Sequence, residues 1–128
     1  MYLVKRYVEI ARALMEKKRT GRTFHVTFIA SKRKLLQIGI NNYKKKAKPS
    51  YKKEGEDSYQ PCIHSELDAL IKIKRDTSNL DFYNIRIDKN GNLAKSEPCI
   101  NCKHLLNEYG FRKIVYFDGK QFKQIRHI

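Results

Sequence analysis

The sequence has few cysteines, and they do not form the pattern of a disulfide-stabilised secreted domain. The three are Cys62, Cys99 and Cys102, an odd number in a chain whose residues 1–19 are interrupted by charge, unlike a signal peptide. An apolar run of membrane-spanning length is also absent. We therefore expect an intracellular protein without membrane contact, whose cysteines serve metal binding or chemistry. At 128 residues, the chain has the size of one domain, which we assign to residues 1–128.

Acidic residues are scarce in the first part of the chain. Residues 1–53 hold 16 Lys and Arg against two acids, whereas residues 54–128 hold 12 against 11, so nearly all of the net charge of +15 lies in the first segment. Six lysines lie in the run YKKKAKPSYKK at 43–53, beside Tyr43 and Tyr51. Such a run suits a polyanion whose bases can stack on the rings, although a solvated loop is the ordinary alternative. The asymmetry favours binding, because charge that serves only solubility need not be concentrated.

Hydrophobic periodicity predicts a helix and two strands in the first part of the chain. Residues 2–16 place apolar side chains at helical spacing, and Gly21 marks the exit from this helix. The runs 23–30 and 35–41 are rich in β-branched and apolar residues and are predicted to be strands joined by a hairpin turn. Both runs are apolar at nearly every position, as expected of strands covered by helices on both faces.

The second part of the chain repeats this alternation. A helix is predicted over 64–76, a strand over 82–88, and a second helix from near Cys99 to Gly110. Two strands over 113–117 and 121–128 form a hairpin, because Asp-Gly between β-prone runs is a strong turn signal. The order αββαβαββ predicts a three-layer α-β-α domain with a five-stranded mixed sheet and a carboxy-terminal β-hairpin.

The residues able to do chemistry lie at two helix starts. Cys99 and Cys102 follow Pro98, and a Cys-x-x-Cys pair at a helix amino terminus has thiols acidified by the helix dipole, which suits thiolate ligation of zinc. His64 supplies a third ligand, and three protein ligands leave one tetrahedral position for water. Glu66 then stays off the metal and handles protons. Taken alone, the cysteine pair is equally compatible with a redox couple or a structural metal clip.

The pattern H-x-E followed by P-C-x-x-C resembles that of zinc-dependent nucleobase deaminases. Over nearly its whole length the chain is similar to the cytidine and deoxycytidylate deaminase superfamily, with the predicted elements in that family's order. The resemblance implies that His64, Cys99 and Cys102 bind Zn²⁺ and that Glu66 is the general acid and base. The expected fold is that of cytidine deaminases.

The same resemblance implies contacts to the substrate. Gly39-Ile40-Asn41 is similar to the G-x-N sequence of related deaminases, whose Asn contacts the nucleotide, so Asn41 is assigned this role with Asn42 as a near competitor. The resemblance further implies that the Glu97 carbonyl receives the leaving amino group and that the Cys99 backbone N–H stabilises the developing oxyanion.

Other residues with ligand chemistry have more ordinary interpretations. Cys62 precedes His64 by two positions, but a fourth protein ligand would close the site to water, so we expect a small buried side chain. His104 is interpreted as a packing or surface histidine, and no motif supports His25 or His127.

The carboxy-terminal hairpin bears on the substrate. In the free-cytidine and bacterial toxin deaminases that the chain resembles, the last two strands run antiparallel, whereas deoxycytidylate and tRNA adenosine deaminases insert a helix and make them parallel. Residues 118–120 are too few to contain a crossover helix. The hairpin therefore favours the first branch over the tRNA adenosine deaminase branch.

Charge is the second discriminator of substrate. A free nucleoside has no phosphate, whereas a polynucleotide releases counterions when lysines bind it. The lysine run joins the strand that ends at Asn41 to the helix that begins at His64, so we expect it beside the pocket mouth. We therefore predict deamination of cytosine in single-stranded DNA or RNA, with contacts from Tyr43, Lys44, Lys45 and Lys46.

Two alternatives to this function are retained. The first is a deaminase of free CMP, dCMP or cytidine, since one or two lysines suffice for one phosphate. The second is a catalytically silent zinc module that binds nucleic acid. The sequence leaves open whether the nucleic acid is DNA or RNA, whether the base is cytosine beyond the resemblance, and whether the chain forms an oligomer.

Overall fold

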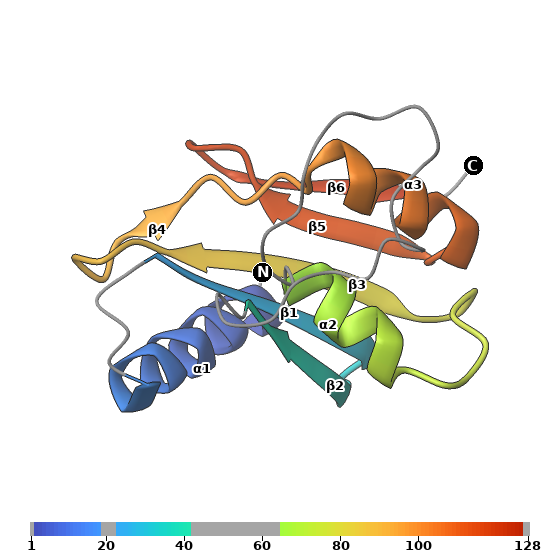
Figure 1. Ribbon diagram of the computed structural model, residues 1–128, viewed down its shortest axis with the longest axis horizontal. Helices are drawn as coiled ribbons and strands as arrows, with labels where there is room; N and C mark the ends of the chain where they lie inside the picture. The colour runs from blue at the N-terminus through green and yellow to red at the C-terminus, as the bar shows by residue number, and fades with distance from the viewer. Residues whose placement is uncertain (1, 19–22, 42–64, 127–128) are drawn as a thin grey trace.

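The computed structural model describes residues 2–18, 23–41 and 65–126, which form three helices and six strands (Figure 1). None of the described helices is long and apolar enough to cross a membrane. In chain order, the elements are α1 (Tyr2–Lys18), β1 (Phe24–Ser31), β2 (Lys34–Ile40), α2 (Ser65–Lys72), β3 (Asp81–Ile87), β4 (Leu93–Ala94), α3 (Ile100–Tyr109), β5 (Lys113–Phe117) and β6 (Phe122–Arg126).

The strands form one mixed sheet, as the sequence predicted. Its order is β2-β1-β3-β5-β6, with β3 and β5 parallel and the other neighbours along this path antiparallel. The predicted hairpin of β5 and β6 is confirmed, and Gly119 in its turn has a φ of 106°. The sixth strand, β4, was not predicted: its two residues pair with the end of β3, where Ile87 lies opposite Leu93.

Helix α1 covers one face of the sheet. The ring of Tyr7 stacks on Phe28 of β1 with centroids 4.7 Å apart and meets the edge of Tyr83 of β3 at 4.9 Å. Alternate residues of the two central strands face this helix, as period-two geometry requires. The buried members of this core are Val4, Tyr7, Val8, Ala11, Phe24, Val26, Phe28, Ala30, Tyr83, Ile85, Ile87 and Val115.

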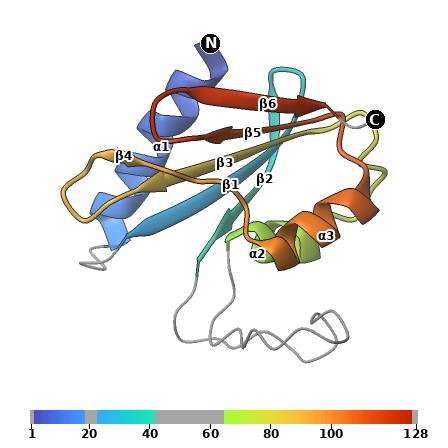
Figure 2. The same cartoon turned by 90° about the horizontal axis from the view of Figure 1, so that it is seen from above.

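Helices α2 and α3 cover the opposite face, so the predicted three layers are present (Figure 2). The intervening residues of the same strands form this second core, in which Ile29 of β1 and Phe82 of β3 pack with α2 and α3. Gly110 ends α3 in the left-handed conformation expected of it, with φ 68° and ψ 44°. The buried members are Ile29, Ala69, Leu70, Leu80, Phe82, Leu106 and Phe111.

Helix α2 is shorter than predicted, since it ends at Lys72 and not at residue 76. The Asp76 carboxylate accepts hydrogen bonds from the backbone N–H and the hydroxyl of Ser78, both at 3.0 Å, and this local turn competes with continued helix. The packed side of α2 is formed by Leu67, Ala69 and Leu70, whereas Ile71 is 39% exposed.

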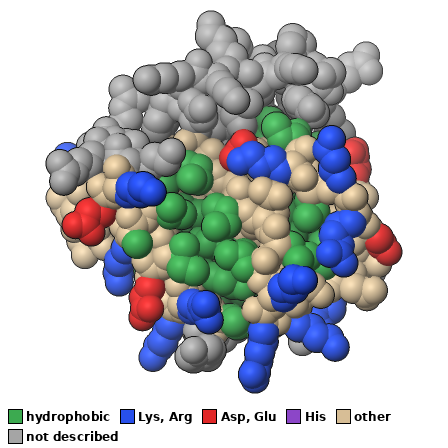
Figure 3. Space-filling view, turned by 90° about the horizontal axis from the view of Figure 1, so that it is seen from below, with side chains coloured by type: hydrophobic (Ala, Val, Ile, Leu, Met, Phe, Trp, Pro, Cys, Tyr) green, Lys and Arg blue, Asp and Glu red, His purple; other side chains and the backbone are tan. Residues whose placement is uncertain are grey.

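Strand β2 also differs from the prediction. It lies at the edge of the sheet, and its apolar side chains contact the cores on both faces but are only half-buried: Leu35, Leu36, Ile38 and Ile40. Figure 3 views the molecule from the side of this edge and shows hydrophobic side chains gathered in the middle of that face, with Lys and Arg around them. An apolar run therefore did not distinguish the edge strand from the buried β1.

Candidate active site

The first turn of α2 packs directly on the end of β2, and Gly39 permits this approach. A Cβ atom at Gly39 would overlap the Ser65 carbonyl oxygen and the Ala69 backbone nitrogen of α2. Both are backbone atoms, which cannot rotate away as a flexible side chain can. A residue without a side chain is therefore needed where β2 passes α2.

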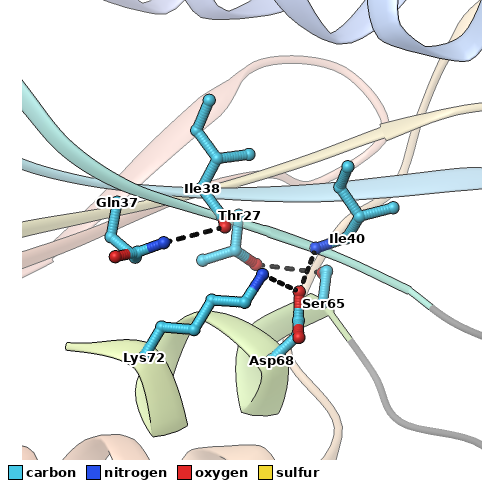
Figure 4. Close-up of polar contacts among 7 residues, drawn as sticks. All are labelled: Thr27, Gln37, Ile38, Ile40, Ser65, Asp68 and Lys72. Atoms are coloured by element: carbon cyan, nitrogen blue, oxygen red, sulfur yellow. Dashed lines mark hydrogen bonds and ion pairs between the residues drawn. The ribbon is translucent and has the colours of Figure 1, made fainter. Parts of the chain in front are cut away.

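Asp68 fixes the same contact by hydrogen bonding. Its Oδ2 accepts from the backbone N–H of Ile40 at 2.9 Å and from Lys72 Nζ at 2.9 Å (Figure 4). The carboxylate thus satisfies a backbone donor of the edge strand that another strand would otherwise pair. Asp68 was not predicted from the sequence, where its signal is an acid in the first turn of an amphipathic helix.

Asn41 follows directly after this contact. Its Oδ1 accepts from the His25 backbone N–H at 3.0 Å, and its own N–H donates to the His25 carbonyl at 3.3 Å. These bonds extend the β1–β2 pairing by one residue and hold the Asn41 amide at the carboxyl end of β2, the end on which α2 begins. The predicted substrate contact and the predicted catalytic helix therefore start from the same corner of the sheet.

Glu66, the predicted general acid and base, is buried with 3% of its surface exposed. Each of its carboxylate oxygens has a partner: Ser65 Oγ lies 3.2 Å from Oε1, and Asn84 Nδ2 donates to Oε2 at 3.3 Å. A buried carboxylate is costly unless it accepts hydrogen bonds. The two contacts therefore both stabilise Glu66 and fix the rotation of its carboxylate.

The partners of Glu66 belong to a buried polar cluster under α2, which we call the Asn84 cluster: Thr27, Ser65, Glu66, Asn84 and Ser96. Thr27 Oγ1 lies 2.9 Å from both Ser65 Oγ and Asn84 Oδ1, and Asn84 Nδ2 also donates to the Ser96 carbonyl at 2.8 Å. Thr27, Asn84 and Ser96 were not predicted from the sequence. A polar residue in the middle of an apolar strand was the signal for the first two.

Ser96 connects this cluster to the segment that leads into α3. Its hydroxyl donates to the Asn84 carbonyl at 2.7 Å and accepts from the Phe117 N–H at 2.9 Å, and its N–H donates to the Phe117 carbonyl at 2.8 Å. The segment is thereby attached to β3 and β5 immediately before Pro98 and Cys99. Cys99 is the N-cap of α3, in an extended conformation and without a side-chain capping bond.

The two cysteines and Glu66 lie together. Cys102 is 4% exposed, and its pKa is raised by its hydrogen bond with Cys99, by burial, and by the negative charges of Glu66 and Cys99. The buried Cys102 thiol and the half-buried Cys99 thiol, beside a carboxylate, are poor anions without a compensating cation, and a divalent metal ion supplies that charge. The donor chemistry therefore fits zinc.

Among the described residues, no group of three His, Cys, Asp or Glu side chains is arranged to hold a metal ion. His64, the expected third ligand, lies outside the described residues, directly before Ser65, the first residue of α2.

The Glu97 side chain lies at the surface. Its carboxylate forms an ion pair with Lys103 Nζ at 2.5 Å, and both side chains are substantially exposed. The hydrogen bond and charge of Lys103, with smaller contributions from Lys95 and Lys123, hold the pKa of Glu97 below its usual value. Lys95, Lys103 and Lys123, none of them predicted from the sequence, therefore act electrostatically on the residue that precedes Pro98.

Most of the other residues considered in the sequence lie outside the described part of the chain. His104, interpreted as a packing or surface histidine, is half-buried on α3. The residues outside the described part are Asn42, Tyr43, Lys44, Lys45, Lys46, Tyr51, Cys62 and His127.

Comparisons with known proteins agree on one family and one fold. The family model for the cytidine and deoxycytidylate deaminase zinc-binding region matches residues 1–118. Among solved structures, the chain is similar to the 1.6 Å crystal structure of cytidine deaminase from Burkholderia pseudomallei, with a TM-score of 0.60 and 15% identity over 94% of this chain and 89% of that chain. At this identity, the likeness concerns the fold alone. No curated protein sequence gives a match.

Proposed function

Because the chain belongs to the cytidine and deoxycytidylate deaminase zinc-binding family, we propose that it hydrolytically converts cytosine to uracil in single-stranded DNA or RNA. The observation that carries the proposal is the meeting of Glu66 with Cys99 and Cys102 at the starts of α2 and α3. A buried carboxylate beside two thiols is suited to proton transfer at a metal site.

The ligands in this proposal are Cys99, Cys102 and His64. Both cysteines lie in or next to the first turn of α3, where unpaired backbone N–H groups favour thiolates. A zinc ion bound there supplies a Lewis acid that makes water nucleophilic near neutral pH.

Glu66 moves the protons. In the overall reaction, water adds its oxygen to C4 of cytosine, the C4–N bond breaks, and ammonia leaves. Glu66 takes a proton from the attacking water, delivers it to N3 of the ring, and then helps to protonate the departing amine. The Cys99 backbone N–H stabilises negative charge on the oxygen, and the Glu97 carbonyl accepts from the amino group. Asn41 contacts the sugar or phosphate of the target nucleotide.

Charge supports a polynucleotide substrate. Tyr43, Lys44, Lys45 and Lys46 are the contacts predicted from the sequence. In the described part of the chain, the charges of Lys95, Lys103 and Lys123 act on Glu97 near the start of α3, and Lys103 and Lys123 also form ion pairs with Glu97 and Asp118. Cations near the site and a net charge of +15 suit a ligand with one phosphate per nucleotide.

A second candidate is deamination of free cytidine, CMP or dCMP. The antiparallel pairing of β6 with β5 favours free cytidine among these substrates, because free-cytidine enzymes share this feature and deoxycytidylate deaminases do not. The catalytically silent zinc module is the third, and a Glu66→Gln variant separates it from both enzymes.

A substrate panel tests the proposal. The protein is incubated with cytidine, CMP, dCMP and cytosine-bearing DNA and RNA oligonucleotides, and uracil and ammonia are quantified. We expect turnover of an oligonucleotide that falls steeply with salt. Turnover of the monomers alone would contradict the polynucleotide claim.

A matched pair of triple variants tests the lysine run. Replacing residues 44–46 with glutamine should weaken oligonucleotide turnover and reduce its salt dependence. The control is the same replacement at the exposed Lys32, Arg33 and Lys34, in the turn after β1 and at the first residue of β2, the opposite end of β2 from Asn41. Equal effects of the two triplets would show that only net charge matters.

A further inference from the structure

We propose that Asn84 is a positioning residue that sets the Glu66 carboxylate relative to the cysteine pair, an inference that rests on the proposed deaminase function. Asn84 lies in the middle of β3, is 1% exposed, and faces the layer of α2 and α3. It is the one residue of the Asn84 cluster whose side chain contacts both Glu66 and the segment before Cys99.

The orientation of the Asn84 amide follows from its neighbours. Its nitrogen faces two acceptors, Glu66 Oε2 at 3.3 Å and the Ser96 carbonyl at 2.8 Å. Its oxygen faces the hydroxyls of Thr27 at 2.9 Å and Ser65 at 3.5 Å. A flipped amide would set an oxygen against a carboxylate and a carbonyl, so the amide always donates to Glu66.

The second contact of the amide connects two helices. The Asn84 side chain donates to the Ser96 backbone carbonyl, and the Asn84 backbone carbonyl accepts from the Ser96 hydroxyl at 2.7 Å, so Asn84 holds Ser96 through two hydrogen bonds. Ser96 lies three residues before Cys99. A single side chain thus bonds to the proton-transfer residue on α2 and to the support of the ligand helix α3.

This arrangement explains why a polar residue occupies the sheet centre. An apolar residue would pack there without the cost of burying an amide. The Asn84 amide donates to Oε2 of Glu66 while the Ser65 hydroxyl contacts Oε1, and both contacts are present without substrate. Loss of the contact should therefore affect the chemical step more than substrate binding.

The test replaces Asn84 with aspartate. Asn84→Asp keeps the size and the oxygen that faces Thr27, but sets a carboxylate oxygen against Glu66 and the Ser96 carbonyl. The matched control is Asp81→Asn, the reverse exchange three residues earlier on β3; Asp81 is also 1% exposed and forms a bidentate ion pair with Arg112. Both variants destabilise β3, but only the first touches Glu66.

For the cytosine compound that the wild type turns over best, we expect Asn84→Asp to lower kcat about 100-fold, since misplacement near 1 Å has this effect. KM should stay within about threefold, and zinc content should be unchanged. Asp81→Asn should lower the unfolding temperature while leaving kcat near the wild-type value. An Asn84→Asp variant with the kcat of Asp81→Asn, or with the loss confined to KM, would overturn the inference.

A double-mutant cycle tests the contact without activity. In the Asn84→Asp background, Glu66→Gln supplies an amide that donates to the new carboxylate, so it should recover most of the lost unfolding temperature. Absence of recovery would overturn the inference even if Asn84→Asp folds too poorly for kinetics. An inactive wild type would refute the proposed function, whereas an active wild type with no Asn84–Glu66 coupling would refute the Asn84 inference alone.

Discussion

Replacing Gly39 with alanine tests how α2 is held against β2. The new Cβ would overlap Ser65 O, Ala69 N and Ala69 Cβ. None of these atoms belongs to a flexible side chain, so the strand and helix must separate. Because α2 carries Glu66 and directly follows His64, the separation moves the predicted site.

The magnitude follows from the geometry. Overpacking of a closely packed interior costs about 1–3 kcal/mol, and contact with backbone on both sides favours the upper end, about 3 kcal/mol. For a domain of this size, that lowers the unfolding temperature by roughly 12 °C. Relief of the overlap requires a retreat of α2 by roughly 1 Å, which should lower the deamination rate about 100-fold.

The assay compares two glycine-to-alanine variants. Gly91→Ala is the control: Gly91 has a φ of +85°, and a Cβ added to it would have no atom within 4 Å, so alanine there adds backbone strain of about 1–2 kcal/mol without a steric clash. Unfolding temperature, zinc content and rate are measured for both. If Gly39→Ala retained zinc and activity and unfolded no earlier than Gly91→Ala, the close approach of α2 would not support the site.

Three further predictions concern stability and the metal. Asp68→Ala should lower the free energy of unfolding, measured in urea, by about 1–3 kcal/mol because it leaves the Ile40 N–H unpaired. Lys72→Ala breaks only an exposed ion pair and should lower it by under about 1 kcal/mol. Equal losses in the two variants would contradict this prediction. Burial raises the pKa of Tyr83 to about 12, so its contribution to stability is complete below the unfolded pKa of about 10 and is lost as the pH rises through 12. In an ultraviolet titration, the Tyr83→Phe variant should lack one late-titrating phenol that the wild type shows. An unchanged titration would refute the assignment. Chelation of zinc should lower the unfolding temperature and expose Cys99 and Cys102 to a thiol reagent. If the chelator did not change the rate at which the reagent modifies these cysteines, thiolate ligation would be contradicted.

The sequence was sufficient for the parts of the molecule that local chemistry determines. The helix of α1, the αL cap at Gly110 and the β5–β6 turn follow from periodicity and turn residues, and all three are present. The cysteine pair was placed at a helix start because its spacing and the preceding Pro98 are local signals. Glu66 was identified by its motif, and the structure adds that it is buried beside those cysteines.

Other parts depend on contacts between distant segments. Asn84, Thr27 and Ser96 come from three separate segments, and only the sheet order and the packing of α2 bring them together. Strand β4 is too short for its pattern to be read, and its pairing is set by the end of β3. Strand β2 has the composition of a buried strand but lies at the edge, because strand order is not encoded in the hydrophobicity of one strand.

The central claim is that Glu66 transfers protons during deamination of cytosine in a single-stranded nucleic acid. The most direct measurement is uracil formation in a cytosine-bearing oligonucleotide by the wild type and by Glu66→Gln, with the zinc content of both samples determined. The account predicts uracil and equimolar ammonia from the wild type, and a loss of at least about 100-fold in the variant at equal zinc content. Uracil formation by Glu66→Gln at the wild-type rate, or none by a zinc-loaded wild type, would contradict it.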